Sequence, residues 1–146
     1  MRIELMTETH VASIAEIEKL CFNDPWSEKS IASELGNRLS LWLVVLDGER
    51  VVAYVGSQSV LGETDMMNIA VHPDYRRQGI AEALVTSLVA ALKEKGNHSL
   101  MLEVRASNAP AKALYEKLGF QQVGVRKNYY RNPREDACIL RKEWEI

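Results

Sequence analysis

The sequence predicts an α/β fold in which helices cover the faces of a mixed sheet, with the element order β-α-α-β-β-β-α-β-α-β-β. Two observations support this class. Residues 39–60 read as two strands joined by the turn Asp47-Gly48, which is an antiparallel hairpin. Further along, apolar strands alternate with helical segments, and a strand–helix–strand unit requires a crossover between parallel strands. A sheet with both kinds of pair is mixed, and helices must cover its apolar faces.

The part of the chain before the hairpin predicts one strand and two helices. Residues 2–6 alternate between polar and apolar side chains, which is typical of a short strand. Thr7 or Thr9 is the expected N-cap of a helix whose apolar side chains recur at helical spacing, namely Val11, Ile14, Ile17 and Leu20. Ser27 is the expected N-cap of a second helix, which ends at Gly36.

The part after the hairpin predicts four strands and two helices. A strand over 64–71 precedes a helix over 79–95, which is apolar on one side and ends at Gly96. A strand over 98–106 leads to a helix that Asn108 caps and that stops at Gly119. The last strands begin at Phe120 and at Ala137. The whole chain, 1–146, is expected to form a single domain.

Composition and charge restrict the partners and the compartment. The net charge of −2 excludes a broadly basic surface, so we expect no direct binding to nucleic acid. No apolar run approaches the roughly 20 residues that span a bilayer, and the N-terminus lacks an apolar signal core. Cys21 and Cys138 lack metal-ligand spacing, and His72 has no second ligand nearby. We therefore expect a cytoplasmic protein without a metal, whose cysteines are small buried apolar residues.

The segment VHPDYRRQGIAEAL, residues 71–84, joins an apolar strand to an apolar helix. The start of a helix presents free N–H groups and the positive end of its dipole, and a glycine lets an anion approach the backbone. Arg76 and Arg77 add donors that fork onto phosphate, so this joint suits a diphosphate. The sequence is neither a Walker A loop nor a dinucleotide fingerprint. An ordinary exposed loop with solvated arginines explains the same residues equally well.

Three residues downstream have side chains suited to acyl transfer. Glu103 interrupts the apolar run LMLEV, and an enclosed carboxylate there would serve as a general base. Strand alternation also allows Glu103 simply to occupy the wetter face of its strand. Asn108 is fully explained as a helix cap, and Tyr115 as a ring at the core edge with its hydroxyl outward. These residues, taken singly, leave both interpretations open.

The segment VHPDYRRQGIAEAL resembles the acyl-CoA-binding segment of the GCN5-related N-acetyltransferases (GNAT), Gln/Arg-x-x-Gly-x-Gly/Ala, at Arg76, Gly79 and Ala81. The resemblance implies the GNAT, or acyl-CoA N-acyltransferase, fold and acetyl-CoA as co-substrate. It also implies which backbone groups bind acetyl-CoA. The CoA pyrophosphate would lie on Arg76, Arg77, Gln78, Gly79, Ile80 and Ala81, and the pantetheine arm and thioester on Ile69, Ala70 and Val71.

The segment LEVRASNAPAKALYEKLGF resembles one subfamily, the ribosomal-protein-alanine N-acetyltransferases of the RimI type. CFNDPWSEKS and RKNYYRNPREDACIL are similar to the early and late motifs of the same subfamily. The resemblance implies that Glu103 is the general base, that Asn108 binds the pantetheine arm, and that Tyr115 contacts CoA and protonates the departing thiolate.

The resemblance further implies an N-terminal acetyltransferase. Its acceptor would be the N-terminal alanine of small-subunit ribosomal protein eighteen, whose amine attacks the thioester directly. Asp24, Glu28, Tyr129 and Tyr130 lie in the segments expected near the peptide. Two alternatives remain: an enzyme of this fold that acetylates lysine or a small amine, and a non-catalytic acyl-CoA-binding regulatory module. The presence of both Glu103 and Tyr115 argues against the regulatory module.

Overall fold

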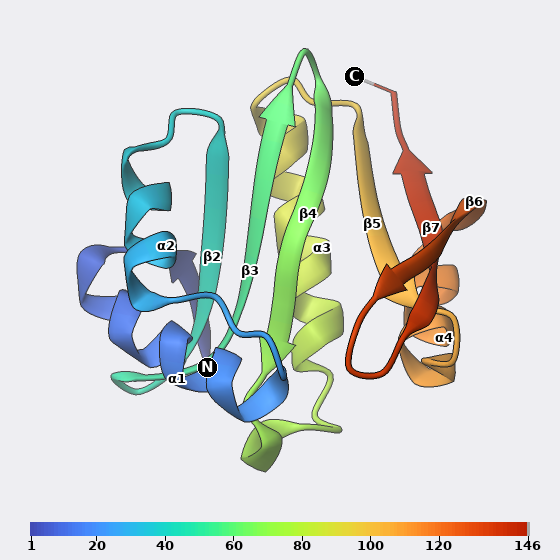
Figure 1. The fold of residues 1–146 in the computed structure, drawn as a ribbon. Helices are drawn as coiled ribbons and strands as arrows, with labels where there is room; N and C mark the ends of the chain where they lie inside the picture. The colour runs from blue at the N-terminus through green and yellow to red at the C-terminus, as the bar shows by residue number, and fades with distance from the viewer. Residues whose placement is uncertain (146) are drawn as a thin grey trace.

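The computed structural model describes residues 1–145, and within them a seven-stranded sheet carries helices on both faces (Figure 1). The strands are β1 Arg2–Leu5, β2 Ser40–Asp47, β3 Arg50–Val60, β4 Glu63–Val71, β5 Ser99–Arg105, β6 Gln121–Tyr130 and β7 Glu135–Glu143. The helices are α1 Val11–Cys21, α2 Glu28–Ser33, α3 Ile80–Glu94 and α4 Ala109–Lys117, with short 3-10 turns at Glu8–His10, Glu34–Gly36 and Pro73–Tyr75. The order of elements confirms the α/β class and the predicted succession.

The sheet is mixed, as predicted, with strand order β1-β2-β3-β4-β5-β7-β6. All neighbouring strands are antiparallel except β4 and β5. The parallel pair is short, because only residues 63–65 of β4 pair with residues 99–101 of β5. Beyond Asp65 the two strands diverge toward the end of β4 that leads into α3 (Figure 1). Backbone groups on this side of β4 are therefore left without a neighbouring strand.

Two apolar clusters hold the helices on the sheet. On one face, Leu84 and Leu88 of α3 pack with Leu100 and Leu102 of β5 and with Tyr115 of α4. On the other face, α1 and α2 pack against β2 and β3, and the buried residues there include Ile14, Ile17, Ile31, Trp42 and Tyr54. Figure 1 shows α1 and α2 on one side of the sheet and α3 on the opposite side.

The predicted helix boundaries are close to those observed. Ser27 accepts the N–H of Ser30 at 3.0 Å, and Asn108 accepts the N–H of Ala111 at 3.2 Å, so both act as N-caps. The first helix differs, since Thr7 starts a 3-10 turn and α1 begins only at Val11. The middle of β3 needs a glycine, because a Cβ on Gly56 would overlap the Trp42 indole. The Trp42 ring therefore lies directly against the backbone of Gly56.

Candidate active site

A cavity of about 750 Å³ lies where β4 and β5 diverge. The segment from β4 to the start of α3 forms one wall, and α4 forms the other. Residues from the predicted binding set that line it are Ile69, Ala70, Val71, Arg76, Arg77, Gly79, Ile80, Ala81, Asn108 and Tyr115. Gln78 and Glu103, which also belong to the predicted site, are not among the lining residues. The cavity thus brings the strand, the helix start and α4 together around one space.

The inner edge of β4 presents its backbone to this cavity. The N–H of His72 donates to the carbonyl of Val52 at 2.8 Å, which shows which residues of β4 point their backbone N–H and C=O groups toward β3. The alternation along that ladder turns the N–H groups of Ile69 and Val71 away from β3. The side chain of Asn68 accepts the Ile69 N–H at 3.1 Å. An extended ligand with amide groups can therefore bind along this edge as a strand would.

The start of α3 has the geometry of an anion site. Gly79 is the N-cap and adopts a left-handed conformation with φ of +76°. A Cβ built there would meet no protein atom within 4 Å, so the space above the helix start is open. Arg77 is also left-handed, with φ of +62°, which turns the loop sharply before the helix. The exposed N–H groups of the first turn and the two arginines suit a diphosphate.

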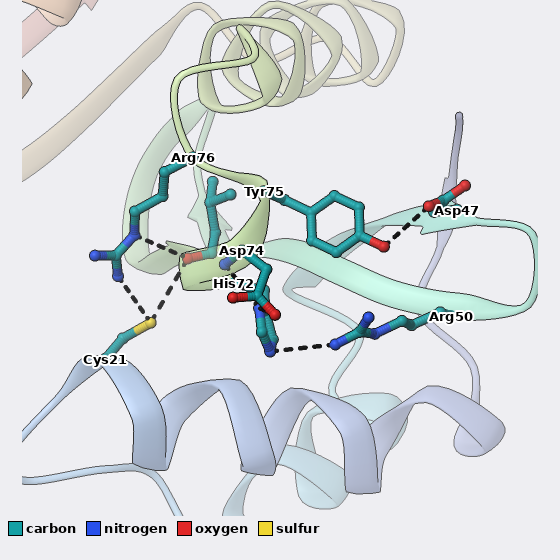
Figure 2. A network of polar contacts seen from close by, with 8 residues as sticks. Cys21, Asp47, Arg50, His72, Asp74, Tyr75 and Arg76 are labelled. Carbon is teal, nitrogen blue, oxygen red and sulfur yellow. Dashed lines mark hydrogen bonds and ion pairs between the residues drawn. The ribbon is translucent and has the colours of Figure 1, made fainter.

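The loop 72–79, which joins β4 to α3 and carries Arg76 and Arg77, is anchored to α1 through Cys21 (Figure 2). Arg76 Nη2 lies 3.3 Å from Cys21 Sγ, and Arg76 Nε donates to the Val71 carbonyl at 3.3 Å. Cys21 is only half-buried and lines the cavity, so its expected role as a buried apolar residue is wrong. The reason is tertiary: α1 ends beside β4, where the thiol meets a carbonyl and a guanidinium. Cys138 is buried, as expected.

The opposite side of the same loop is held by β2 and β3, as Figure 2 shows. The Tyr75 hydroxyl donates to Asp47 Oδ2 at 3.0 Å. The Arg50 guanidinium lies 5.4 Å from the centre of the Tyr75 ring and contacts the His72 ring. Over residues 1–145 no group of three metal-ligating side chains is present, and no helix is long and apolar enough to cross a membrane.

Tyr115 points from α4 toward the point where β4 and β5 separate. The residue is only 5% exposed, and its hydroxyl lies 3.9 Å from Met66 Sδ. The alternative of an outward hydroxyl is therefore wrong, because α4 packs with this edge facing the sheet. Burial raises the pKa of the Tyr115 phenol to about 12. The phenol consequently keeps its proton at neutral pH and can donate it.

Glu103 lies on the other face of β5. Leu100, Leu102 and Val104 are buried against the helices, as strand alternation predicts. The Glu103 side chain is 20% exposed, and its Oε1 accepts from Arg126 Nε at 3.2 Å. The carboxylate is thus half-buried and ion-paired, and it does not face the cavity that holds Tyr115.

Two tyrosines of β6 lie near Glu103, and Arg126, its ion-pair partner, is 5.9 Å from the centre of the Tyr129 ring. Burial is the largest cause that raises the pKa of both Tyr129 and Tyr130, the latter to about 12, and the charge of Glu103 adds to each shift. The Arg105 guanidinium lies 4.4 Å from the centre of the Tyr130 ring. Aromatic rings, a carboxylate and arginines therefore form a second polar region beside the cavity, on the sheet face that α1 and α2 also cover.

The sequence offered little sign of some cavity residues. Phe22, Pro110, Ala111, Leu114 and Lys117 line the cavity without any motif of their own that predicts a ligand. Glu18 does not line the cavity, but it is a buried carboxylate on the apolar stripe of α1, where a charged residue is unusual. A charged residue on the buried face of a helix is the signal that would have found it.

Comparison with known proteins identifies relatives of this chain. The acetyltransferase (GNAT) family profile matches residues 11–120. The [ribosomal protein bS18]-alanine N-acetyltransferase of Escherichia coli (strain K12) is 43% identical over 140 residues, which cover 94% of each chain. A putative enzyme of the same name from Bacillus subtilis (strain 168) is 41% identical over 128 residues, covering 87% of this chain and 85% of the relative.

Solved structures give the same result. The crystal structure of the ribosomal-protein-S18-alanine N-acetyltransferase from Escherichia coli superposes with a TM-score of 0.91 at 41% identity, covering 99% of this chain and 94% of that one. Ard1 from Thermoplasma volcanium, at 21% identity, shares the fold with a TM-score of 0.89 over 99% of this chain and 98% of that one. The family profile, the similar sequences and the shared fold all point to one family, and the chain belongs to the GNAT acetyltransferases.

Proposed function

We propose that this protein transfers the acetyl group of acetyl-CoA to the N-terminal amine of ribosomal protein bS18, which begins with alanine. The observation that carries the proposal is the divergence of β4 and β5, which places an open strand edge between Tyr115 on one face and Glu103 on the other. The relatives at 41–43% identity are named for this acceptor. A role in the cytoplasm follows from such an acceptor.

The lining of the cavity supports a place for the pyrophosphate and for the pantetheine arm of acetyl-CoA. The pyrophosphate lies over the helix start, where Gly79 leaves the N–H groups of α3 accessible and Arg76 and Arg77 supply positive charge. The pantetheine amides lie along the edge of β4 that faces away from β3, where the Val71 N–H points outward and Asn68 contacts the Ile69 N–H. Asn108, at the start of α4, contacts the same arm from the other wall.

The chemistry needs one base, one acid and donors for an oxyanion. Glu103 accepts a proton from the α-ammonium, directly or through one water, because an α-amine has a pKa of roughly 7.7–8.0. The free amine then forms a bond to the thioester carbon, β4 N–H groups stabilise the developing oxyanion, and the attacking nitrogen releases its second proton to water as the amide forms. As the carbon–sulfur bond breaks, Tyr115 donates its phenolic proton to the sulfur. The products are the acetylated peptide and CoA, and Tyr115 regains a proton from solvent.

The acceptor peptide reaches the thioester from the side of Glu103. The carboxylate lies near Arg126, Tyr129 and Tyr130. The two tyrosine rings provide an apolar surface for the first side chain of a peptide. Asp24 and Glu28 are exposed in the α1–α2 segment and are left without a catalytic role.

The test is an acetylation assay with the purified protein, acetyl-CoA and peptides of the bS18 N-terminus. One peptide has a free α-amine, and a matched peptide has a blocked α-amine and an internal lysine. We expect acetylation of the first peptide at its terminus, located by mass spectrometry. Acetylation of the blocked peptide alone would instead identify a lysine acetyltransferase. Acetyl-CoA binding without transfer to any peptide or amine would identify a regulatory module.

A further inference from the structure

Glu18 is a buried carboxylate that the proposed chemistry does not use. It lies on α1, is 1% exposed, and is surrounded by hydrogen-bond donors from three other segments. Its Oε2 accepts from the Tyr54 hydroxyl and from Asn68 Nδ2, the latter at 2.6 Å. Its Oε1 accepts the backbone N–H of Trp26 at 2.8 Å. Burying a carboxylate is costly unless it is hydrogen-bonded, and three donors meet this need.

One arm of this network leads to the acetyl-CoA side. Asn68 donates with its amide nitrogen to Glu18, and its amide oxygen accepts the N–H of Ile69 at 3.1 Å. Ile69 lines the cavity, and its N–H faces away from β3. An asparagine amide is nearly symmetric in shape, so its orientation depends on its partners. Because Glu18 only accepts, it keeps the amide oxygen of Asn68, rather than the nitrogen, next to the strand edge.

The other arm leads to the acceptor side. The Trp26 N–H belongs to the segment 22–27, which joins α1 to α2. Phe22 at the start of this segment lines the cavity, and Asn23 donates to the Asn132 carbonyl between β6 and β7 at 2.8 Å. The Trp26 ring packs edge-on against Trp42, with ring centres 5.5 Å apart. Glu18 therefore fixes the end of a segment whose start contacts the cavity through Phe22 and the β6–β7 loop through Asn23.

We propose that Glu18 is a positioning residue. Through Asn68 it holds the cavity-facing edge of β4, through Trp26 it holds the segment 22–27, and it thereby fixes the two relative to each other. This inference rests on the proposed acetyl transfer and extends it to a residue outside both substrate sites. The two arms meet at one carboxyl group, so a shift of either arm changes the angle at which the amine approaches the thioester. Transfer rates depend steeply on such placement.

Substitution by glutamine tests the proposal because it preserves size and removes one acceptor. If the new amide oxygen replaces Oε2, its NH₂ group faces the Trp26 N–H, and two donors oppose each other. If the oxygen replaces Oε1, the NH₂ group faces Asn68 Nδ2 and again opposes a donor. Either orientation breaks one arm, so Glu18→Gln cannot preserve the network.

Glu34 provides a matched control. It is also a buried carboxylate, 8% exposed, and it accepts from the side chains of Asn37, Ser40 and Gln58. Those partners lie directly after the 3-10 turn Glu34–Gly36, in β2 and in β3, and Glu34 does not line the cavity. Glu34→Gln therefore removes an acceptor of the same kind from a network without a connection to the proposed site.

The experiment measures kcat and KM for a bS18 N-terminal peptide, and thermal unfolding, for the wild type, Glu18→Gln and Glu34→Gln. Both variants should lose some stability. Only Glu18→Gln should lower kcat/KM, by about tenfold or more, as expected when a hydrogen bond to a charged group is lost. A folded Glu18→Gln variant whose kcat and KM match those of Glu34→Gln would overturn the proposal. A wild type that transfers no acetyl group would instead contradict the proposed function itself.

A second variant keeps the test decisive if Glu18→Gln does not fold. Asn68 is half-buried, so Asn68→Ala leaves Glu18 bonded to Tyr54 and Trp26 and removes only the acetyl-CoA arm. We expect kcat to fall severalfold while the peptide KM stays within twofold, because the acceptor arm is intact. An unchanged kcat would overturn the proposal.

Discussion

The Tyr115 hydroxyl lies 3.9 Å from Met66 Sδ, directly after the last residue of β4 that pairs with β5. The phenol is thus buried at the point where the strands begin to separate. A thioester that lies along the free edge of β4 would bring its sulfur to this region. Burial at this point raises the pKa of Tyr115, and the closeness of its hydroxyl to the free edge of β4 supports its proposed role as the acid.

Replacing Tyr115 with phenylalanine should reduce turnover without abolishing acetyl-CoA binding. General acid catalysis contributes typically 10²–10⁴-fold, so kcat should fall by about 100-fold or more. Calorimetric titration with acetyl-CoA should give a Kd within about threefold of the wild type, since the ring and its packing on Phe120 remain. Turnover equal to that of the wild type would remove Tyr115 as the acid.

The same substitution should change the alkaline stability. The pKa of Tyr115 is about 12 in the folded state and close to 10 in the unfolded chain. The stabilisation that follows from this difference is fully present below pH 10 and is lost as the pH rises to 12. Between pH 9 and pH 11 the unfolding free energy of the wild type should fall by about 1 kcal/mol more than that of Tyr115→Phe. Urea denaturation of both proteins at the two pH values measures this, and parallel losses would contradict it.

Glu103→Gln should slow transfer most at low pH. Below about pH 7.7 the peptide α-amine is mainly protonated and needs a base, whereas at pH 9 it is mainly free. The ratio of wild-type to variant kcat/KM should therefore be large at pH 6.5 and fall toward pH 9. Glu49→Gln is the control, because Glu49 is exposed in the β2–β3 turn, away from the cavity. A ratio that is constant across the pH range would indicate that Glu103 positions the peptide instead.

Gly79→Ala should weaken acetyl-CoA binding, and Gly96→Ala should not. Both glycines flank α3, both have a positive φ, and a Cβ on either meets no protein atom within 4 Å. Each substitution should cost about 1 kcal/mol of unfolding free energy, because alanine is strained in this conformation. Only the Cβ at position 79 projects into the space proposed for the pyrophosphate. Equal Kd values for acetyl-CoA in the two variants would contradict the proposed location.

Much of the fold follows from local patterns. The hairpin at Asp47-Gly48, the caps at Ser27 and Asn108, and the glycine before α3 each have a short-range cause, and the structure confirms them. The short length of the parallel β4–β5 pair was not predictable, because pairing between strands depends on residues far apart in sequence. The insertion of β7 between β5 and β6 has the same origin.

The candidate site shows the same division. The sequence pattern around Gly79 predicted a place for an anion, and strand alternation around Glu103 predicted which neighbours would be buried. The environment of Cys21 differed from expectation, and for Tyr115 the alternative of an outward hydroxyl was wrong, because each is decided by the element packed against it. Assignment of Glu103, Asn108 and Tyr115 to their catalytic roles still rests on resemblance and stays a prediction.

The sequence by itself determined the α/β class, the order of the elements and the family, because periodicity, caps and the Arg76–Ala81 motif are local features. Only the tertiary structure decided that β4 and β5 part after Asp65, that Tyr115 turns inward, and that Glu18 collects donors from three segments. These features arise where distant segments pack together, since burial and hydrogen bonding depend on neighbours that no local pattern specifies.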